Sequence, residues 1–171
     1  MHVMNKIGIA ALLLAVCVSR PVHAQPGDQR CVRKQRDTLV VSCGSVIGQA
    51  GKYRVTRGGM LDARKGTTAT VDDGGKAVAG AGSHVVAYSG SQAEARDGSY
   101  VVARLGSRVN AGKGSRVEAQ ANSTVDAGEG AYVVAYPGSS VTAGKGSTVM
   151  NCGGKVIDRG GAETECKDSV I

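Results

Sequence analysis

Residues 106–121 read GSRVNAGK followed by GSRVEAQA, which are two versions of one eight-residue unit. The unit recurs without insertion along most of the chain, and its first position falls at residues 58 to 154 in steps of eight. Twelve of these thirteen sites are Gly and the other is Asn122. Gly and Asn tolerate a left-handed backbone best. The repeat therefore predicts a turn with a positive φ once in every octad.

Within each unit the apolar positions lie two residues apart. The fourth position is mostly Val or Ala, beginning with Tyr53 and Leu61, and the sixth is Ala or Val from Val55 to Ala143. Side chains two apart share one face of a strand, so the spacing predicts a short strand whose third and fifth positions point to solvent. The Ser at position two is expected to satisfy amides of the turn. A helix is excluded, because each Gly would cost about 1 kcal/mol relative to Ala and the period does not fit a helical repeat.

A second period of sixteen residues distinguishes alternate units. The seventh position is Gly at residues 80, 112, 128 and 144, with Arg96 as the exception, whereas the other set has Tyr88, Arg104, Gln120 and Tyr136. Two octads would then form one coil with two different sides, each strand stacking on an equivalent one. The sequence predicts an all-β, two-sided parallel β-solenoid, a β-roll or β-helix with sixteen residues per coil. An up-and-down meander is the alternative.

Residues 25–49 and 154–171 are predicted to cap a solenoid formed by residues 50–153. Thirteen octads give six and a half coils and, at about 4.8 Å per coil, a rod of roughly 30 Å. A disulfide needs Cα atoms within about 7 Å, so none can join the two ends of such a rod. The pairings left are Cys31–Cys43 and Cys152–Cys166, each closing a loop over a terminal edge. A metal site is the alternative, but no Cys-x-x-Cys or nearby His accompanies these cysteines.

Residues 1–24 have the features of a secretory signal peptide, with Lys6 near the start, an apolar run from residue 7 to 18, and Val22-His23-Ala24 at the end. The apolar run is shorter than the roughly 20 residues of a spanning helix, and no later stretch is suited to cross a bilayer. We therefore expect an exported protein, secreted or periplasmic, in an oxidising compartment where cysteines pair.

The basic residues are concentrated in one part of the chain. Residues 25–65 hold nine basic and three acidic side chains, whereas residues 66–171 hold ten and eleven. The densest basic group is Arg30, Arg33, Lys34 and Arg36. In an exported protein this group would meet anionic lipid headgroups or acidic polysaccharide before nucleic acid, which is not an expected partner. A solvated face that aids solubility is the alternative.

The units at residues 82, 98, 114 and 130 would stack large side chains on one outward face. We call this the tyrosine face and define it by seven candidate binding residues, His84, Tyr88, Tyr100, Arg104, Arg116, Tyr132 and Tyr136. It includes four of the five tyrosines, with a column of Val86, Val102, Glu118 and Val134 beside them. The opposite face would show Lys76, Gln92, Arg108, Thr124 and Ser140.

An aromatic and Val-rich stripe suits a sugar chain, an envelope surface or a second copy of the protein. The alternative is that Arg116 merely stacks between Tyr100 and Tyr132 and that Val fits a strand well. His84 is the only histidine after residue 24, and no Ser or Cys is placed to use it as a base. The sequence thus predicts no catalytic, metal or cofactor site.

The repeat also resembles a known one. Residues 138–149, GSSVTAGKGSTV, are similar to the octapeptide repeats of bacterial ice-nucleation proteins, whose Gly-Ser-Thr-Leu-Thr-Ala units form sixteen-residue coils. The resemblance covers residues 58–153 and implies the coil. In that family outward Thr-x-Thr pairs order water, and only Thr68 and Thr70 reproduce such a pair here. The resemblance therefore argues against ice activity.

Taken together, these features favour an exported, non-catalytic structural or interaction protein of the cell envelope or exterior, which binds a glycan or a protein through the tyrosine face. One alternative is a secreted enzyme or inhibitor with active groups in the caps, for instance at residues 30–36 or 163–168. Another is an ice- or water-ordering protein.

Overall fold

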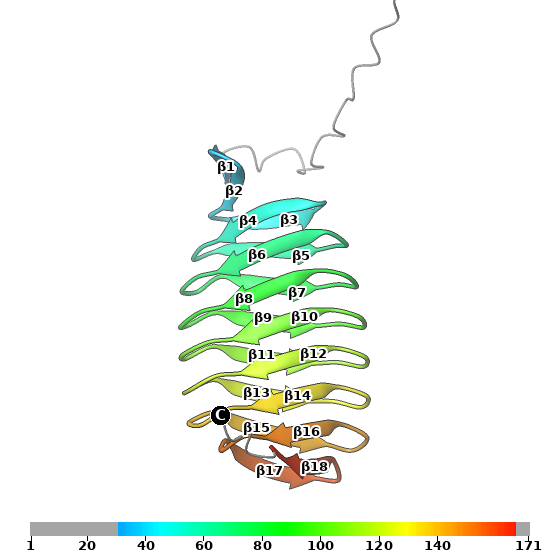
Figure 1. The fold of residues 1–171 in the computed structure, drawn as a ribbon. Helices are drawn as coiled ribbons and strands as arrows, with labels where there is room; N and C mark the ends of the chain where they lie inside the picture. The colour runs from blue at the N-terminus through cyan, green and yellow to red at the C-terminus, as the bar shows by residue number, and fades with distance from the viewer. Residues whose placement is uncertain (1–30, 167–171) are drawn as a thin grey trace, which may run out of the picture.

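The computed structural model describes residues 31–166 and contains eighteen β-strands and no helix in that range. The strands wind into a rod of stacked coils (Figure 1). Among the described residues, no helix is long and apolar enough to cross a bilayer. The predicted signal peptide at residues 1–24 and Arg30 of the basic group lie outside the described residues.

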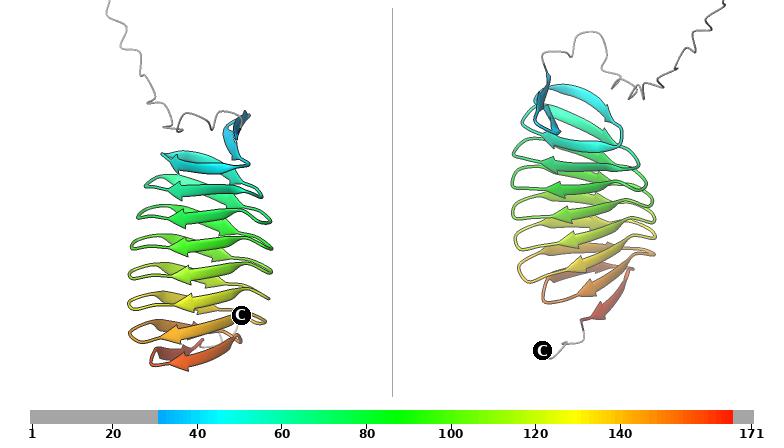
Figure 2. Two further views of the ribbon diagram at one scale, coloured as in Figure 1. Left: turned by 180° about the vertical axis from the view of Figure 1, so that it is seen from behind. Right: turned by 45° about the horizontal axis from the view of Figure 1, so that its top comes forward.

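The strands form two sheets that lie on opposite sides of the rod (Figure 2). Sheet A contains, in spatial order, β1 (Val32–Gln35), β2 (Thr38–Val41), β4 (Gly51–Val55), β6 (Thr67–Val71), β8 (His84–Ala87), β10 (Tyr100–Ala103), β12 (Arg116–Ala119), β14 (Tyr132–Ala135), β16 (Thr148–Asn151) and β18 (Ala162–Glu165). Sheet B contains β3 (Gly44–Gly48), β5 (Gly59–Ala63), β7 (Lys76–Ala79), β9 (Gln92–Ala95), β11 (Arg108–Ala111), β13 (Thr124–Ala127), β15 (Ser140–Gly144) and β17 (Lys155–Arg159).

Strand pairing confirms the two-sided parallel β-solenoid and excludes the meander. In the body each strand pairs in parallel with the strand two places along the chain, as in Tyr100 with Arg116 of β12 and Arg108 with Thr124 of β13. Both pairs are sixteen residues apart, which is the predicted coil. The β1–β2 hairpin, in contrast, is antiparallel.

The interior consists of the fourth and sixth positions of the repeat, as predicted. Val101 of sheet A and Val109 of sheet B are both fully buried, and Val117 stacks on Val101 in the next coil. Tyr53, the fifth tyrosine, fills the interior near the N-terminal end, where its hydroxyl accepts a hydrogen bond from the Gln49 N–H at 3.1 Å. The core is thus a narrow double row of small side chains.

Each corner is a tight turn around one left-handed residue. Gly114 has a φ of 67° and Asn122 a φ of 56°, as the repeat predicts. The Ser at position two is buried. The sequence predicts that its hydroxyl accepts from turn amides, but in the structure the hydroxyl donates to a carbonyl instead. The Gly112 carbonyl accepts from both the backbone N–H and the hydroxyl of Ser115, at 3.2 and 2.7 Å. The corners therefore satisfy their own polar groups.

The coils shorten toward both ends. Thr38 pairs with Lys52, and Thr148 pairs with Ala162, each over fourteen residues. At the corner between β16 and β17, Gly153 and not Gly154 has the positive φ, so the octad register slips there by one residue. Sheet B has eight strands, which makes eight coils instead of the predicted six and a half, because the parallel ladder starts before residue 50 and continues beyond residue 153.

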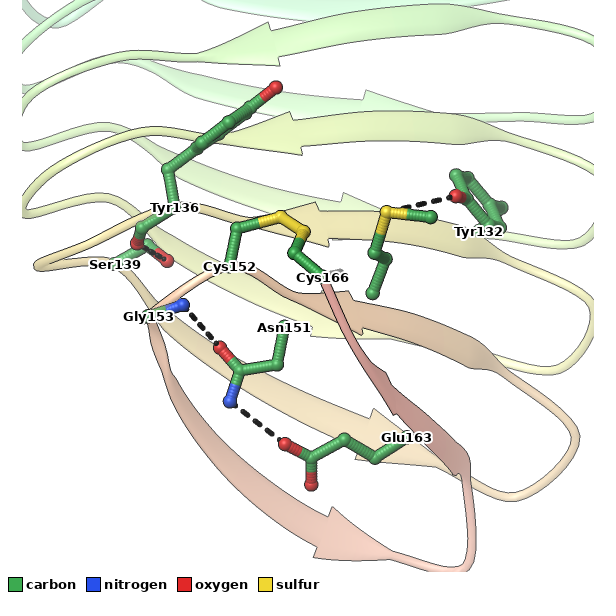
Figure 3. The surroundings of a disulfide bond; sticks show 9 residues. Tyr132, Tyr136, Ser139, Asn151, Cys152, Gly153, Glu163 and Cys166 are labelled. Atoms are coloured by element: carbon green, nitrogen blue, oxygen red, sulfur yellow. Dashed lines mark hydrogen bonds between the residues drawn. A yellow bond between two sulfur atoms is a disulfide. The ribbon is translucent and has the colours of Figure 1, made fainter. Parts of the chain in front are cut away.

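The two disulfides have the predicted pairing. Cys31–Cys43 and Cys152–Cys166 have Cα–Cα separations of 4.8 and 4.9 Å and flank the first and last strands of sheet A. Beside the second bridge, the Asn151 amide donates to the Glu163 carboxylate at 2.8 Å (Figure 3). Glu163 is in register with inward-facing Val149. A charged residue thus ends the apolar interior, which discourages another chain from pairing with β18.

Candidate binding face on sheet A

The tyrosine face lies on strands β8, β10, β12 and β14 and on the corners that follow them. The parallel register stacks its first column in the order His84, Tyr100, Arg116 and Tyr132. The second column continues the ladder through the seventh position of each unit, since the N–H groups of Tyr88, Arg104, Gln120 and Tyr136 bond to carbonyls of the preceding coil. The structure therefore brings all seven predicted residues onto one side of the rod.

Within these columns the side chains form stacked pairs. The His84 and Tyr100 rings have centroids 4.9 Å apart, and the Arg116 guanidinium lies 5.4 Å from the centre of the Tyr132 ring. Arg104 lies over Tyr88 in the same way, at 5.3 Å. Such cation–π contacts contribute about 0.5–1 kcal/mol at exposed sites. They hold both arginines close to the surface of the sheet.

The most accessible aromatic rings of the tyrosine face lie in the second column. Tyr88 and Tyr136 are each 38% exposed, and Leu105, the residue after Arg104, is 56% exposed. Tyr100 and Tyr132 are half-buried, and the Tyr132 hydroxyl donates to the Met150 sulfur at 3.8 Å. Figure 3 shows Tyr136 extending over the strands away from the rod end. A ligand would therefore meet Tyr88 and Tyr136 first.

The valines beside the tyrosines are less accessible than the alternation predicts. Val102 and Val134 point outward in register, yet they are only 7% and 6% exposed. Each follows its tyrosine by two residues, and the large neighbouring side chains on the same face cover it. The surface offered to a ligand is thus aromatic and charged, with little exposed Val from these two positions.

Tyr100 has an unusual electrostatic environment. Burial, followed by hydrogen bonding to Glu118 and repulsion from its carboxylate, raises the pKa of Tyr100 to about 12. Beside it, the Nε2 atom of His84 is buried and has no hydrogen-bond partner among residues 31–166. The centre of the first column is therefore partly desolvated, and the neutral phenol of Tyr100 is favoured there.

The outer face of sheet B is different. From β9 to β15 its third and fifth positions are all polar or charged, and they include the predicted Gln92, Arg108, Thr124 and Ser140. A shallow groove of about 620 Å³ runs along its edge over the backbone of Gly112, Gly128 and Gly144. A Cβ at Gly144 would lie 2.5 Å from the Ala127 carbonyl oxygen, so close backbone packing explains that glycine.

Two charged groups lie outside the tyrosine face as it is defined. Arg33, Lys34 and Arg36 are exposed on the β1–β2 hairpin at the N-terminal end of the rod (Figure 1). Asp72 and Asp73 are each ion-paired, with Arg54 at 2.5 Å and Arg57 at 2.7 Å. Each ion pair joins adjacent turns of the sixteen-residue coil.

The fold and this face together define the chain as a disulfide-closed parallel β-solenoid with one aromatic outer face. No family model, curated protein or solved structure matches the chain.

Proposed function

We propose that this chain is an exported, non-catalytic structural or interaction protein of the cell envelope or exterior, and that its tyrosine face binds a glycan. The supporting observation is the arrangement of aromatic rings and arginines at the coil spacing. Tyr88 and Tyr136 expose their rings, and Arg104 lies between them in the same column. The features of residues 1–24 and the two disulfides support export into an oxidising compartment.

The chemistry of the face favours sugars over purely apolar ligands. Aromatic rings supply flat apolar surface for the C–H face of a sugar, whereas guanidinium and carboxylate groups supply donors and acceptors for hydroxyls. Because the coils repeat at about 4.8 Å, equivalent groups recur along the rod at a spacing suited to an extended polymer. A protein partner is the alternative occupant of the same face.

Pull-down from cell-envelope fractions tests this proposal. We expect the wild-type chain to retain a polysaccharide from a protease-treated fraction, and Tyr88→Ala combined with Tyr136→Ala, the exposed rings, to retain about tenfold less while keeping its circular dichroism. The control is Arg108→Ala combined with Thr124→Ala, on the outer face of sheet B. Equal retention by both double variants would reject the tyrosine face, and loss of all retention after protease treatment would indicate a protein ligand.

A further inference from the structure

A hollow of about 430 Å³ opens on the outer face of sheet A, on the N-terminal side of the tyrosine face. Its polar lining comes from four successive coils, namely β2, β4, β6 with its following corner, and the corner after β8: Thr38, Lys52, Arg54, Thr68, Thr70, Asp72 and Tyr88. The volume is within the range of small-ligand sites, about 300–1,000 Å³. Only Tyr88 of this set belongs to the tyrosine face.

The charges of the hollow are balanced. The Arg54 Nε donates to the Asp72 carboxylate at 2.5 Å, and the Lys52 ammonium donates to Asp37 at 2.5 Å. Lys52 holds the pKa of Asp37 below its ordinary value through this hydrogen bond and charge. With each cation neutralised by a carboxylate, the hollow has no net attraction for an anion, and it suits a neutral ligand.

The polar groups of the hollow keep unused hydrogen-bonding capacity. A guanidinium has five N–H donors and an ionised carboxylate has about four acceptor sites, so the Arg54–Asp72 pair offers donors and acceptors side by side. The hydroxyls of Thr68 and Thr70 lie on the neighbouring strand and can both donate and accept. Adjacent hydroxyl groups of a sugar match this combination.

Tyr88 adds an apolar wall. Arg104 lies over its ring at 5.3 Å, and the ring also lines the hollow and is 38% exposed. A sugar ring has one relatively apolar face that packs against an aromatic ring while its hydroxyls reach polar partners. From these observations we infer that the hollow is a saccharide subsite for a neutral sugar ring with adjacent hydroxyls. The inference rests on the proposed glycan binding and names the kind of sugar unit and where it is held.

The test uses disaccharides and amide NMR on the full chain with its disulfides intact. A disaccharide is too short to bridge Tyr88 and Tyr136, which lie three coils and roughly 14 Å apart. The probes are cellobiose, maltose and di-N-acetylchitobiose as neutral sugars and digalacturonate as the charged counterpart. We expect a neutral disaccharide to shift the amides of β4, β6 and β8 and to bind more tightly than digalacturonate.

Three variants sharpen the test. Tyr88→Ala and Asp72→Asn should each weaken the neutral disaccharide about tenfold. Tyr136→Ala is the comparison variant, since Tyr136 occupies the same column with the same 38% exposure but does not line the hollow. We expect it to lose less affinity for the disaccharide than Tyr88→Ala does.

The outcomes separate this inference from the proposed function. Shifts confined to β10, β12 and β14, equal losses in the Tyr88 and Tyr136 variants, or tighter binding of digalacturonate would overturn the subsite and leave glycan binding by the face standing. If no disaccharide shifts any described amide, the subsite is rejected, and polysaccharide retention in the pull-down then decides the proposed function alone.

Discussion

Sheets A and B are built from the same octad and share one interior, yet their outer faces differ. Inside, Val117 of sheet A and Val109 of sheet B are equally buried. Outside, the same strands carry Arg116 between two tyrosines on sheet A and Arg108 among polar residues on sheet B. The repeat therefore constrains inward positions and corners, whereas outward positions are free to specialise.

The largest expected effect comes from substitutions that disrupt the interior shared by the two sheets. Val117→Asp and Val109→Asp each place a carboxylate among fully buried Val and Ala side chains, at a cost of several kcal/mol, which is a large part of a domain's stability. Both variants should lose the cooperative unfolding transition in a denaturant titration followed by circular dichroism. Asn110→Asp, beside Val109 but pointing outward, is the control. Tolerance of one buried variant alone would show that the two sheets do not share one core.

The two sheets differ in how their terminal strands are held, since both disulfides flank strands of sheet A. Replacing Cys31 and Cys43 together by Ser should lower the free energy of unfolding by about 3 kcal/mol, because the closed loop of about a dozen residues is released in the unfolded chain. Hydrogen exchange should accelerate at β1 and β2 and remain slow at β10 and β11. Equal acceleration in the body would mean that the bridge stabilises the whole rod uniformly.

The next effect depends on pH and is specific to sheet A. The pKa of Tyr100 is raised to about 12, so folding favours the neutral phenol, and this contribution is present below about pH 10 and lost as pH rises through about 12. Phenolate absorbance of the native chain should show an ionisation step near pH 12 that is missing in Tyr100→Phe.

A second variant tests the cause. Because Glu118 raises the pKa of Tyr100 through its hydrogen bond and its charge, Glu118→Gln should move that step to lower pH. An unchanged step would mean that burial, the largest cause, raises the pKa of Tyr100 without help from Glu118.

The regularity of the repeat explains why so much of the fold could be predicted. Gly at position one and the two apolar positions recur often enough to specify corner, strand and coil, and the coil length then left one disulfide pairing. The ends were harder, because coils that shorten to fourteen residues no longer show the octad. The slip at Gly153 is one such change.

For the binding surface, the sequence could predict only which side chains stack in columns on the outer face of sheet A. Register places Tyr88, Arg104 and Tyr136 on one face, but burial of Val102 and Val134 depends on how the neighbouring side chains lie across them. The hollow was missed for a related reason. Its lining includes the Arg54–Asp72 ion pair, which joins residues eighteen apart and is not a feature of the repeat.

The smallest expected effect concerns an ion pair on sheet B. Glu94 and Arg96 lie 2.9 Å apart, but their side chains are 51% and 58% exposed. Solvent screening leaves such a pair little net energy, so Glu94→Gln should leave the denaturant midpoint almost unchanged. Asp72→Asn on sheet A removes the partner of Arg54 where the carboxylate is 27% exposed, and it should cost slightly more, up to about 1 kcal/mol. Denaturant midpoints measured in low and high salt compare the two variants. A larger loss for Glu94→Gln would mean that the polar face contributes stability that its exposure does not predict.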